Sequence, residues 1–391
     1  MRKPMKMNIK ALAILSMTHL VTDLNQGALP ILLPFFKEAL NLSYTMTGTI
    51  LLFGNLSSSV IQPVFGYISD RRPMGWILPL ATFIACLGMS FTGLIQNYFL
   101  LLLCVIVNGI GAASFHPEGF KTAYFFTGEK KATGMAIFYM GGNLGFSLGP
   151  IWVLTLVTFF GLKGTLGMNI PGILMGAILL FYFSWLTKPV HSAFEKAKEQ
   201  KKPLLKKEKN TLFLLISIVI TRSWAQFGLV TYIPFYFINY LKGDPLYAGR
   251  LVSVYLLAGT LGTLVGGPLA DRWGHKIFIC TTLLLSTPLL LLFYNTSGPL
   301  LFVVLAITGM VLISSFTVTV VMAQTLFPQH LGMISGLMVG FAMGTGGIGV
   351  TLLGTIADHW GVPMCLKVIA LLPFIAFLLS LFLPSQKVKL T

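Results

Sequence analysis

Apolar runs of about 20 residues recur along this chain from end to end, and they constrain its fold more than any other feature. A run of that length matches the roughly 30 Å hydrocarbon core of a bilayer. Backbone groups in lipid must be hydrogen-bonded within the protein, so such runs must be helices. Only 10% of the 391 residues are charged, against about 25% in a soluble domain. The sequence therefore predicts an all-α membrane protein.

The distribution of basic residues predicts the orientation of these helices. We expect twelve transmembrane helices in two six-helix pseudo-symmetric halves, at residues 11–36, 45–69, 76–96, 98–126, 132–160, 168–187, 211–239, 246–270, 276–294, 299–325, 332–356 and 362–383. Twenty Lys and Arg residues then lie on the side of both termini and five on the other. By the positive-inside rule both termini are expected to be cytoplasmic. The net charge of +16 is thus a topology signal, and no nucleic-acid partner is expected.

One long polar stretch, Lys188 to Asn210, interrupts the apolar runs. It predicts an N-terminal half at 1–187, a cytoplasmic linker at 188–210 and a C-terminal half at 211–391. An internal repeat supports this division. The repeat comprises Gly66, Asp70 and Arg71, which recur 201 residues later as Gly267, Asp271 and Arg272.

A second repeat consists of glycines spaced four residues apart. Gly141, Gly145 and Gly149, followed by Pro150, lie in the fifth predicted span, and Gly336, Gly340 and Gly344 lie in the eleventh. Small residues at this spacing let two membrane helices pack closely. Two halves of the same orientation form the parallel-repeat plan of many secondary transporters.

With these residues in place, the chain resembles the major facilitator superfamily over essentially its whole length. Its first half carries a set of motifs: Thr18-His19-Leu20, Asp23, Gln26, Gln62-Pro63, Gly66-Tyr67, Asp70, Ser114-Phe115-His116-Pro117-Glu118, Gly141-Gly142-Asn143, Gly145 and Leu148-Gly149-Pro150. In these motifs it resembles the fosmidomycin resistance family, whose members are thought to export drugs or metabolites. The resemblance implies the same fold and a similar function here. Gly119-Phe120-Lys121 departs from the family's small, small, Arg pattern, which leaves the substrate open.

The resemblance also implies roles for two of these motifs. The fifth-span glycines with Pro150 resemble a motif associated with antiporters. Asp70-Arg71 and Asp271-Arg272 are expected to latch a cytoplasmic gate, with each Asp accepting hydrogen bonds from a neighbouring helix terminus. Solvated turn charges are the alternative for the gate residues, and helix packing alone is the alternative for the glycines.

Ionisable residues inside a span cost roughly 2.5 to 3.5 kcal/mol on insertion scales, so each is a functional hypothesis. Asp23 lies near the middle of the first span, with His19 one turn away on the same face and Gln26 extending it. Arg222 falls at comparable depth in the seventh span. We hypothesise that Asp23 contacts Arg222, carries the proton, and on protonation frees Arg222 for an anion. A permanent structural ion pair is the alternative.

The fourth span carries three further ionisable residues. Glu118 and Lys121 are three apart and share one face of the helix. A substrate or proton role for Glu118 is one hypothesis, and a local ion pair that only makes insertion tolerable is the alternative. His116 and Glu118 would point in nearly opposite directions unless Pro117 kinks the helix. The candidate proton-coupling residues are Asp23, Glu118, His19 and His116, and the candidate substrate-binding residues are Arg222, Lys121, Gln26, Asn143 and Gln226.

Catalytic motifs are missing from the sequence. It has no nucleophile elbow, metal-ligand cluster or phosphate loop, so we expect no enzyme activity, cofactor or metal. We predict instead a proton-coupled exporter of a small polar or anionic compound in a bacterial-type inner membrane, working as a monomer with protons, a small-molecule substrate and the lipid bilayer as partners. Proton symport importing an anionic metabolite, and a receptor or scaffold that no longer transports, are the alternatives.

Overall fold

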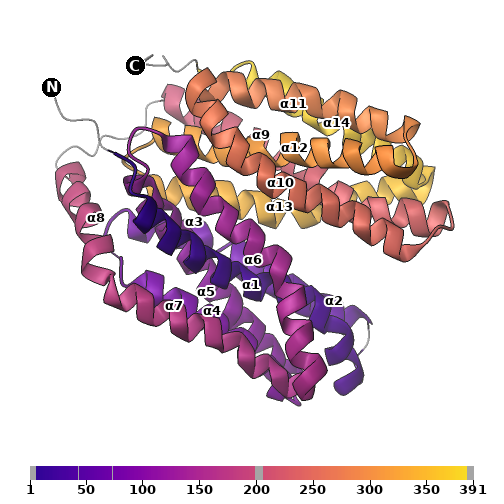
Figure 1. Cartoon of the computed structure of the whole chain (residues 1–391), viewed down its shortest axis with the longest axis horizontal. Helices are drawn as coiled ribbons and strands as arrows, with labels where there is room; N and C mark the ends of the chain where they lie inside the picture. Colours follow the sequence, from indigo (N-terminus) through magenta and orange to yellow (C-terminus); the bar gives the residue numbers. More distant parts are fainter. Residues whose placement is uncertain (1–5, 43, 73, 199–205, 385–391) are drawn as a thin grey trace. The chain divides into compact units, whose positions relative to one another are not determined.

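Helices account for every regular element that the structure describes. This computed structural model describes residues 6–42, 44–72, 74–198 and 206–384 (Figure 1). No strand is present within these ranges, which confirms the all-α class.

The helices follow the predicted spans closely. They are α1 (Ile9–Ala39), α2 (Tyr44–Ser59), α3 (Gln62–Ser69), α4 (Ile77–Phe91), α5 (Tyr98–Phe126), α6 (Lys131–Phe160), α7 (Asn169–Phe181), α8 (Phe183–Lys198), α9 (Lys206–Pro234), α10 (Pro245–Trp273), α11 (His275–Leu292), α12 (Gly298–Leu326), α13 (Leu331–Trp360) and α14 (Val362–Ser380). Short 3₁₀ turns extend α4, α6 and α11, and a π-helical turn, Phe235–Tyr240, extends α9.

Ten stretches of the described helices are long and apolar enough to cross a membrane. One of them, Lys131–Phe181, contains both α6 and α7, and α1 lies outside all ten. Separating α6 from α7 and adding α1 gives the twelve predicted spans. The polar side chains of α1, among them His19 and Asp23, lower its mean hydropathy, which explains why α1 lies outside the ten.

Two predicted segments differ from the observed helices. The second span is divided into α2 and α3 beside Gln62-Pro63, because Pro63 has no backbone N–H to donate to the preceding turn. The predicted linker is helical at both ends, since α8 continues to Lys198 and α9 begins at Lys206. Residues 199–205 of the linker lie outside the described residues.

The chain forms two compact units, and each of them includes the first residues of a helix whose remainder belongs to the other. Unit 1 comprises Met1–Glu129, Ile137–Lys202 and Phe327–Gly340, and unit 2 comprises Lys130–Ala136, Pro203–Leu326 and Phe341–Thr391. The first residues of α6 therefore belong to unit 2, and the first residues of α13 belong to unit 1. A domain boundary at 188–210 stays a prediction.

Glycines bring the backbones of α1 and α6 into direct contact within unit 1 (Figure 1). A Cβ atom on Gly141, Gly145 or Gly149 would lie 1.9, 2.1 or 2.2 Å from the carbonyl oxygen of the facing α1 residue. Those oxygens belong to Ser16, Leu20 and Leu24, also four residues apart. The glycines thus let the two helix backbones touch, while their association with antiport stays a prediction.

This packing predicts the effect of adding one methyl group. Gly145→Ala should lower the melting temperature of the detergent-purified protein, because overpacking typically costs about 1–3 kcal/mol. Gly347→Ala is the matched control, since no heavy atom lies within 4 Å of its Cβ position and Ala favours a helix. Equal effects of the two substitutions on thermal unfolding would contradict the packing role.

Candidate functional site

A buried polar cluster in unit 1 joins α1 to α5. The Asp23 carboxylate lies with Oδ2 3.2 Å from His19 Nε2 and Oδ1 2.9 Å from His116 Nε2. All three side chains are buried. We call His19, Asp23 and His116 the His–Asp–His cluster.

Local helix geometry places two of its members together. His19 and Asp23 are four residues apart on α1 and therefore share a face, as the sequence predicts. The His19 ring stacks on Phe138 of α6, with ring centroids 4.5 Å apart. Its Nδ1 lies 3.1 Å from the Phe138 carbonyl oxygen. Because a carbonyl oxygen only accepts, His19 Nδ1 must carry a hydrogen.

In His116 the hydrogen lies on the other ring nitrogen, Nε2. The Gln62 amide nitrogen donates to the Ser58 carbonyl and lies 3.4 Å from His116 Nδ1. Nδ1 of His116 is therefore the acceptor, and its Nε2 carries the hydrogen that is donated to Asp23.

One proton remains to be placed, between His19 Nε2 and Asp23 Oδ2. Without it, two lone pairs face each other at 3.2 Å. With it, the cluster is neutral, either as His19⁺ with Asp23⁻ or as two neutral groups. Without it, the cluster carries one negative charge. The hydrogen-bond network thus gives the cluster one exchangeable proton at a defined contact.

Gly142 of α6 packs directly against the contact between His19 and Asp23. A Cβ atom on Gly142 of α6 would lie 2.4 Å from His19 Nε2 and 2.7 Å from Asp23 Oδ2. The missing side chain therefore leaves the space that the His19–Asp23 pair occupies.

Among the described residues, the His–Asp–His cluster is the group that could hold a metal ion, with its ligand atoms within 4.8 Å of one another. Both carboxylate oxygens of Asp23 already lie at hydrogen-bond distance from imidazole nitrogens. We therefore interpret the contacts as proton-sharing ones, and the expected lack of a metal stays a prediction.

A second buried cluster lies further along α5. Lys121 Nζ lies 2.7 Å from Glu118 Oε2, which is the local ion pair that the sequence offered as an alternative, while a transport role of either residue stays a prediction. Lys121 also donates to the carbonyl and hydroxyl of Ser69, and the Ser69 hydroxyl contacts Glu118 Oε2. Since α5 is continuous through Pro117, His116 and Glu118 contact different neighbours. This ion pair fixes Ser69, the residue before the gate residue Asp70.

Asp70 caps a helix start in the same unit. Its Oδ1 accepts from the Gly332 N–H and its Oδ2 from the Met333 N–H, each at 2.8 Å. A Cβ on Gly66 would lie 2.3 Å from the Gly332 carbonyl oxygen. The carboxylate thus meets the positive end of α13. Arg71 stacks over Tyr67, with its guanidinium carbon 4.0 Å from the ring centroid.

Asp271 repeats this arrangement in unit 2. It accepts from the Ala132 N–H at 2.9 Å and the Thr133 N–H at 2.8 Å, and also from the Thr133 hydroxyl. Gly267 packs against this start of α6, and Arg272 is exposed. The expected hydrogen-bond geometry is present in both repeats, while the gating role stays a prediction.

Unit 2 contains a buried guanidinium. Arg222 on α9 is 3% exposed. It donates through Nε to the Leu312 carbonyl at 3.2 Å and through Nη2 to the Ile313 carbonyl at 3.4 Å. Its guanidinium carbon lies 5.3 Å from the Phe316 ring centroid. The predicted contact between Asp23 and Arg222 joins the two units and stays a prediction.

The remaining candidate substrate residues are amides. The side-chain nitrogens of Gln26 on α1 and Asn143 on α6 are buried without a hydrogen-bond partner. Buried donors in this state are rare in native proteins, so both side chains stay candidates for contact with a polar solute. Gln226 on α9 is partly buried, and its substrate role stays a prediction.

Sequence reasoning missed several functional contacts. It did not place His116 beside Asp23, and it overlooked Ser69, Gln62 and Phe138 as partners of the clusters. A Gln-Pro pair within an apolar run was the available signal for Gln62, because both a buried amide and a helix break need a reason. The Phe138 contact is made by a backbone carbonyl, which leaves no mark in the sequence.

Comparison with known proteins now identifies the family. A family model described as the Major Facilitator Superfamily matches residues 15–249 and 236–390. The chain belongs to the major facilitator superfamily. It follows from this membership that the chain has the twelve-helix fold, crosses the membrane several times and is not an enzyme.

Two curated relatives match this transporter along nearly its whole length. It is 33% identical to the uncharacterized MFS-type transporter YfnC of Bacillus subtilis over 97% of this chain and 94% of the relative. It is 31% identical to the fosmidomycin resistance protein of Escherichia coli over 97% and 93%, respectively. The resemblance to the fosmidomycin resistance family is therefore confirmed.

Solved structures share the fold of this transporter at low sequence identity. The superfamily transporter FucP in its outward conformation matches with a TM-score of 0.74 and 15% identity, over 96% of this chain and 99% of FucP. The human organic anion transporter MFSD10 matches with a TM-score of 0.69 and 17% identity, over 95% and 99%.

The Asp70 cap predicts a pH effect at the gate. Burial raises the pKa of the Asp70 carboxyl from 3.8 to about 6. The hydrogen bonds from the Met333 and Gly332 N–H groups and the charge of Lys121 oppose this increase, and the charge of Glu118 adds to it. The capped state therefore binds a proton more tightly than a state in which Asp70 meets water. Protonation favours the capped state below about pH 6, and this advantage is lost as the pH rises through 6.

Hydrogen exchange at the Gly332 and Met333 amides checks this effect. After correction for intrinsic exchange, protection should fall about tenfold between about pH 5 and pH 7.5. Asp70→Asn should remove the pH dependence. A wild-type protection that rises with pH would contradict the linkage.

Proposed function

We propose that this transporter couples the movement of protons to the efflux of a small polar or anionic organic compound across a bacterial inner membrane, with both termini in the cytoplasm. The observation that carries the proposal is the His19–Asp23 contact, a buried pair with one exchangeable proton. The relation to a fosmidomycin resistance protein supports efflux, because resistance follows when a drug is exported.

The hydrogen bonds of the two histidines beside Asp23 support the proposed coupling to protons. Phe138 and Gln62 fix one nitrogen of each imidazole, so protonation is directed to the contact between His19 Nε2 and Asp23 Oδ2. His116 holds the other carboxylate oxygen in place. We assign Asp23 and His19 as the shared proton carrier and His116 as a positioning donor.

The substrate component is supported by buried donors. Arg222 keeps its positive charge at all physiological pH values, and its stacking on Phe316 presents the guanidinium next to an aromatic surface. In the same unit, the Trp224 indole N–H is buried without a hydrogen-bond partner. Gln26 and Asn143 supply donors in unit 1. Donors of this kind favour a compound with carboxylate, phosphonate or hydroxyl oxygens.

A second function, import of an anion together with a proton, is favoured by one observation. The protonated His–Asp–His cluster is neutral, whereas the deprotonated cluster carries one negative charge that would repel an anion. The two functions differ in the sign of linkage. In antiport, substrate binding should release a proton and tighten as the pH rises, whereas in symport it should take up a proton and weaken.

Asp23→Asn and His19→Gln should each reduce proton-driven transport in proteoliposomes at least tenfold, because neither variant can share the proton. Counterflow exchange, which needs no net proton movement, should persist. The matched control is His359→Gln, which removes an exposed histidine near the end of α13. Loss of neither activity would exclude the cluster from coupling.

Arg222→Ala should weaken binding of anionic compounds at least tenfold, measured by titration with fosmidomycin and a panel of small phosphonates and carboxylates. Arg222→Lys should restore part of the affinity, since it keeps the charge but loses the planar donor fork. Arg250→Ala, at an exposed arginine of α10, is the control. Unchanged anion affinity in Arg222→Ala would show that Arg222 is structural, whatever the outcome at Asp23.

A further inference from the structure

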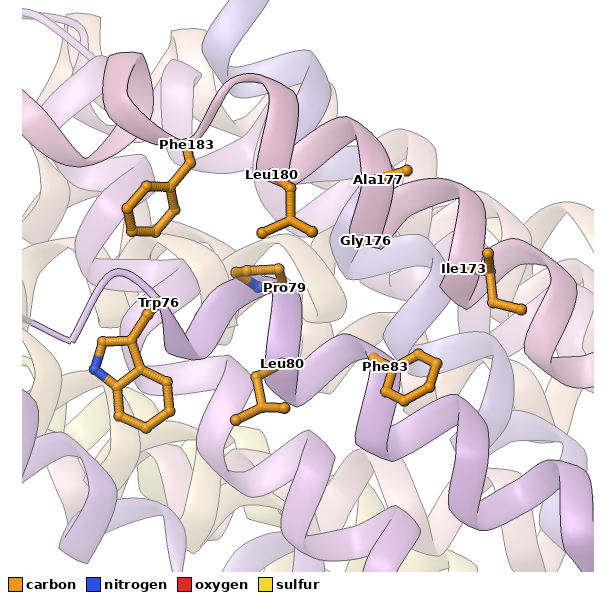
Figure 2. A pocket seen from close by; sticks show the side chains of 9 residues that line it. All are labelled: Trp76, Pro79, Leu80, Phe83, Ile173, Gly176, Ala177, Leu180 and Phe183. Carbon is orange, nitrogen blue, oxygen red and sulfur yellow. The ribbon is translucent and has the colours of Figure 1, made fainter.

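An apolar groove runs between α4 and α7 in unit 1, away from both buried clusters. Figure 2 shows the side chains of the two helices facing one another across it. Its volume is about 550 Å³. Trp76, Leu80 and Phe83 line one wall, and Ile173, Leu180 and Phe183 line the other. Among the side chains lining this groove, the Trp76 indole nitrogen is the only polar atom.

A missing side chain creates the space. Gly176 lies in the middle of the α7 wall, and no heavy atom lies within 4 Å of the position that its Cβ would take. The flanking Ile173 and Leu180 are 54% and 65% exposed. In a membrane-spanning helix, side chains exposed to this degree on an apolar face meet hydrocarbon. The groove is therefore suited to a flexible alkyl chain.

Charge is concentrated at one end of the groove. Trp76 marks that end, four residues after Arg72 and five after Arg71, and both arginines are exposed. Phe183 marks the same end on the other wall, and the exposed Lys188 follows it on α8.

A direct contact joins the two segments that carry these cations. A Cβ on Gly75 would lie 2.3 Å from Thr187 Cγ2, so the loop before α4 packs against α8 next to Lys188. By contrast, α4 and α7 carry no charged residue along their length. Exposed cations thus flank the Trp76–Phe183 end of the groove, and the two helices that form its walls carry no charge.

We propose that this groove binds an anionic phospholipid, with one acyl chain between α4 and α7 and the headgroup phosphate at Arg72 and Lys188. The two cations match one lipid phosphate, and Trp76 lies where the apolar groove meets charge, as is typical of interfacial tryptophans. The site is separate from the proposed transport chemistry.

Native mass spectrometry of the delipidated full-length protein tests this site. Titration with phosphatidylglycerol should show one lipid bound at least tenfold more tightly than phosphatidylethanolamine of the same acyl chains. Gly176→Leu should abolish this tight binding, because the new side chain extends from an open Cβ position into the groove. Gly347→Leu, at a helical glycine that also has open space around its Cβ position, should leave it unchanged.

Two further measurements locate the headgroup and the chain. Arg72→Gln with Lys188→Gln should remove the preference for phosphatidylglycerol. Bromine on the acyl chain should quench fluorescence in the wild type more than in Trp76→Phe. Equal affinity for the two lipids, or tight binding that survives Gly176→Leu, would overturn the proposal.

Discussion

A carboxylate inside a bilayer must have its charge compensated by the protein itself, and the packing of the first unit follows from meeting that need at Asp23. Two imidazoles hold its two oxygens. His19 in turn needs an acceptor for Nδ1, which the Phe138 carbonyl supplies. That contact requires α6 to lie directly on α1, which is possible because three glycines face the α1 carbonyls. Side-chain chemistry and backbone packing are thus parts of one arrangement.

The helix α5 connects this arrangement to the Asp70 cap. It contributes His116 to the His–Asp–His cluster and Glu118 and Lys121 to the contact with Ser69. Asp70 follows Ser69 directly and caps α13. Because a helix rises about 1.5 Å per residue, His116 and Lys121 are separated by only about 7.5 Å along the axis. A small displacement of α5 would therefore act on both the His–Asp–His cluster and Ser69, the residue beside the Asp70 cap.

The two repeats share an aspartate that caps a helix start, and they differ in their buried charged groups. Asp70 and Asp271 each receive two backbone N–H groups from a helix start. Phe115 and Phe316 are also 201 residues apart, yet the next residue is His116 in the first repeat and Thr317 in the second. The His–Asp–His cluster belongs to the first repeat and the buried guanidinium to the second.

Local patterns in the sequence determined the helices, the repeat, the glycine packing and the few residues able to carry charge. These features depend on run length, on spacing and on the cost of placing charge in lipid, all of which act within a single helix. His19 and Asp23 were paired for the same reason, since one turn separates them.

Only the tertiary structure decided which helices supply partners to each charge. It placed His116 beside Asp23, Ser69 between Glu118 and Lys121, and carbonyl groups of α12 beside Arg222. It also opened the groove at Gly176. These contacts depend on how each helix is rotated and how closely it packs against its neighbours. Spacing along one chain segment cannot specify that rotation, because it is fixed by the side chains of several helices at once.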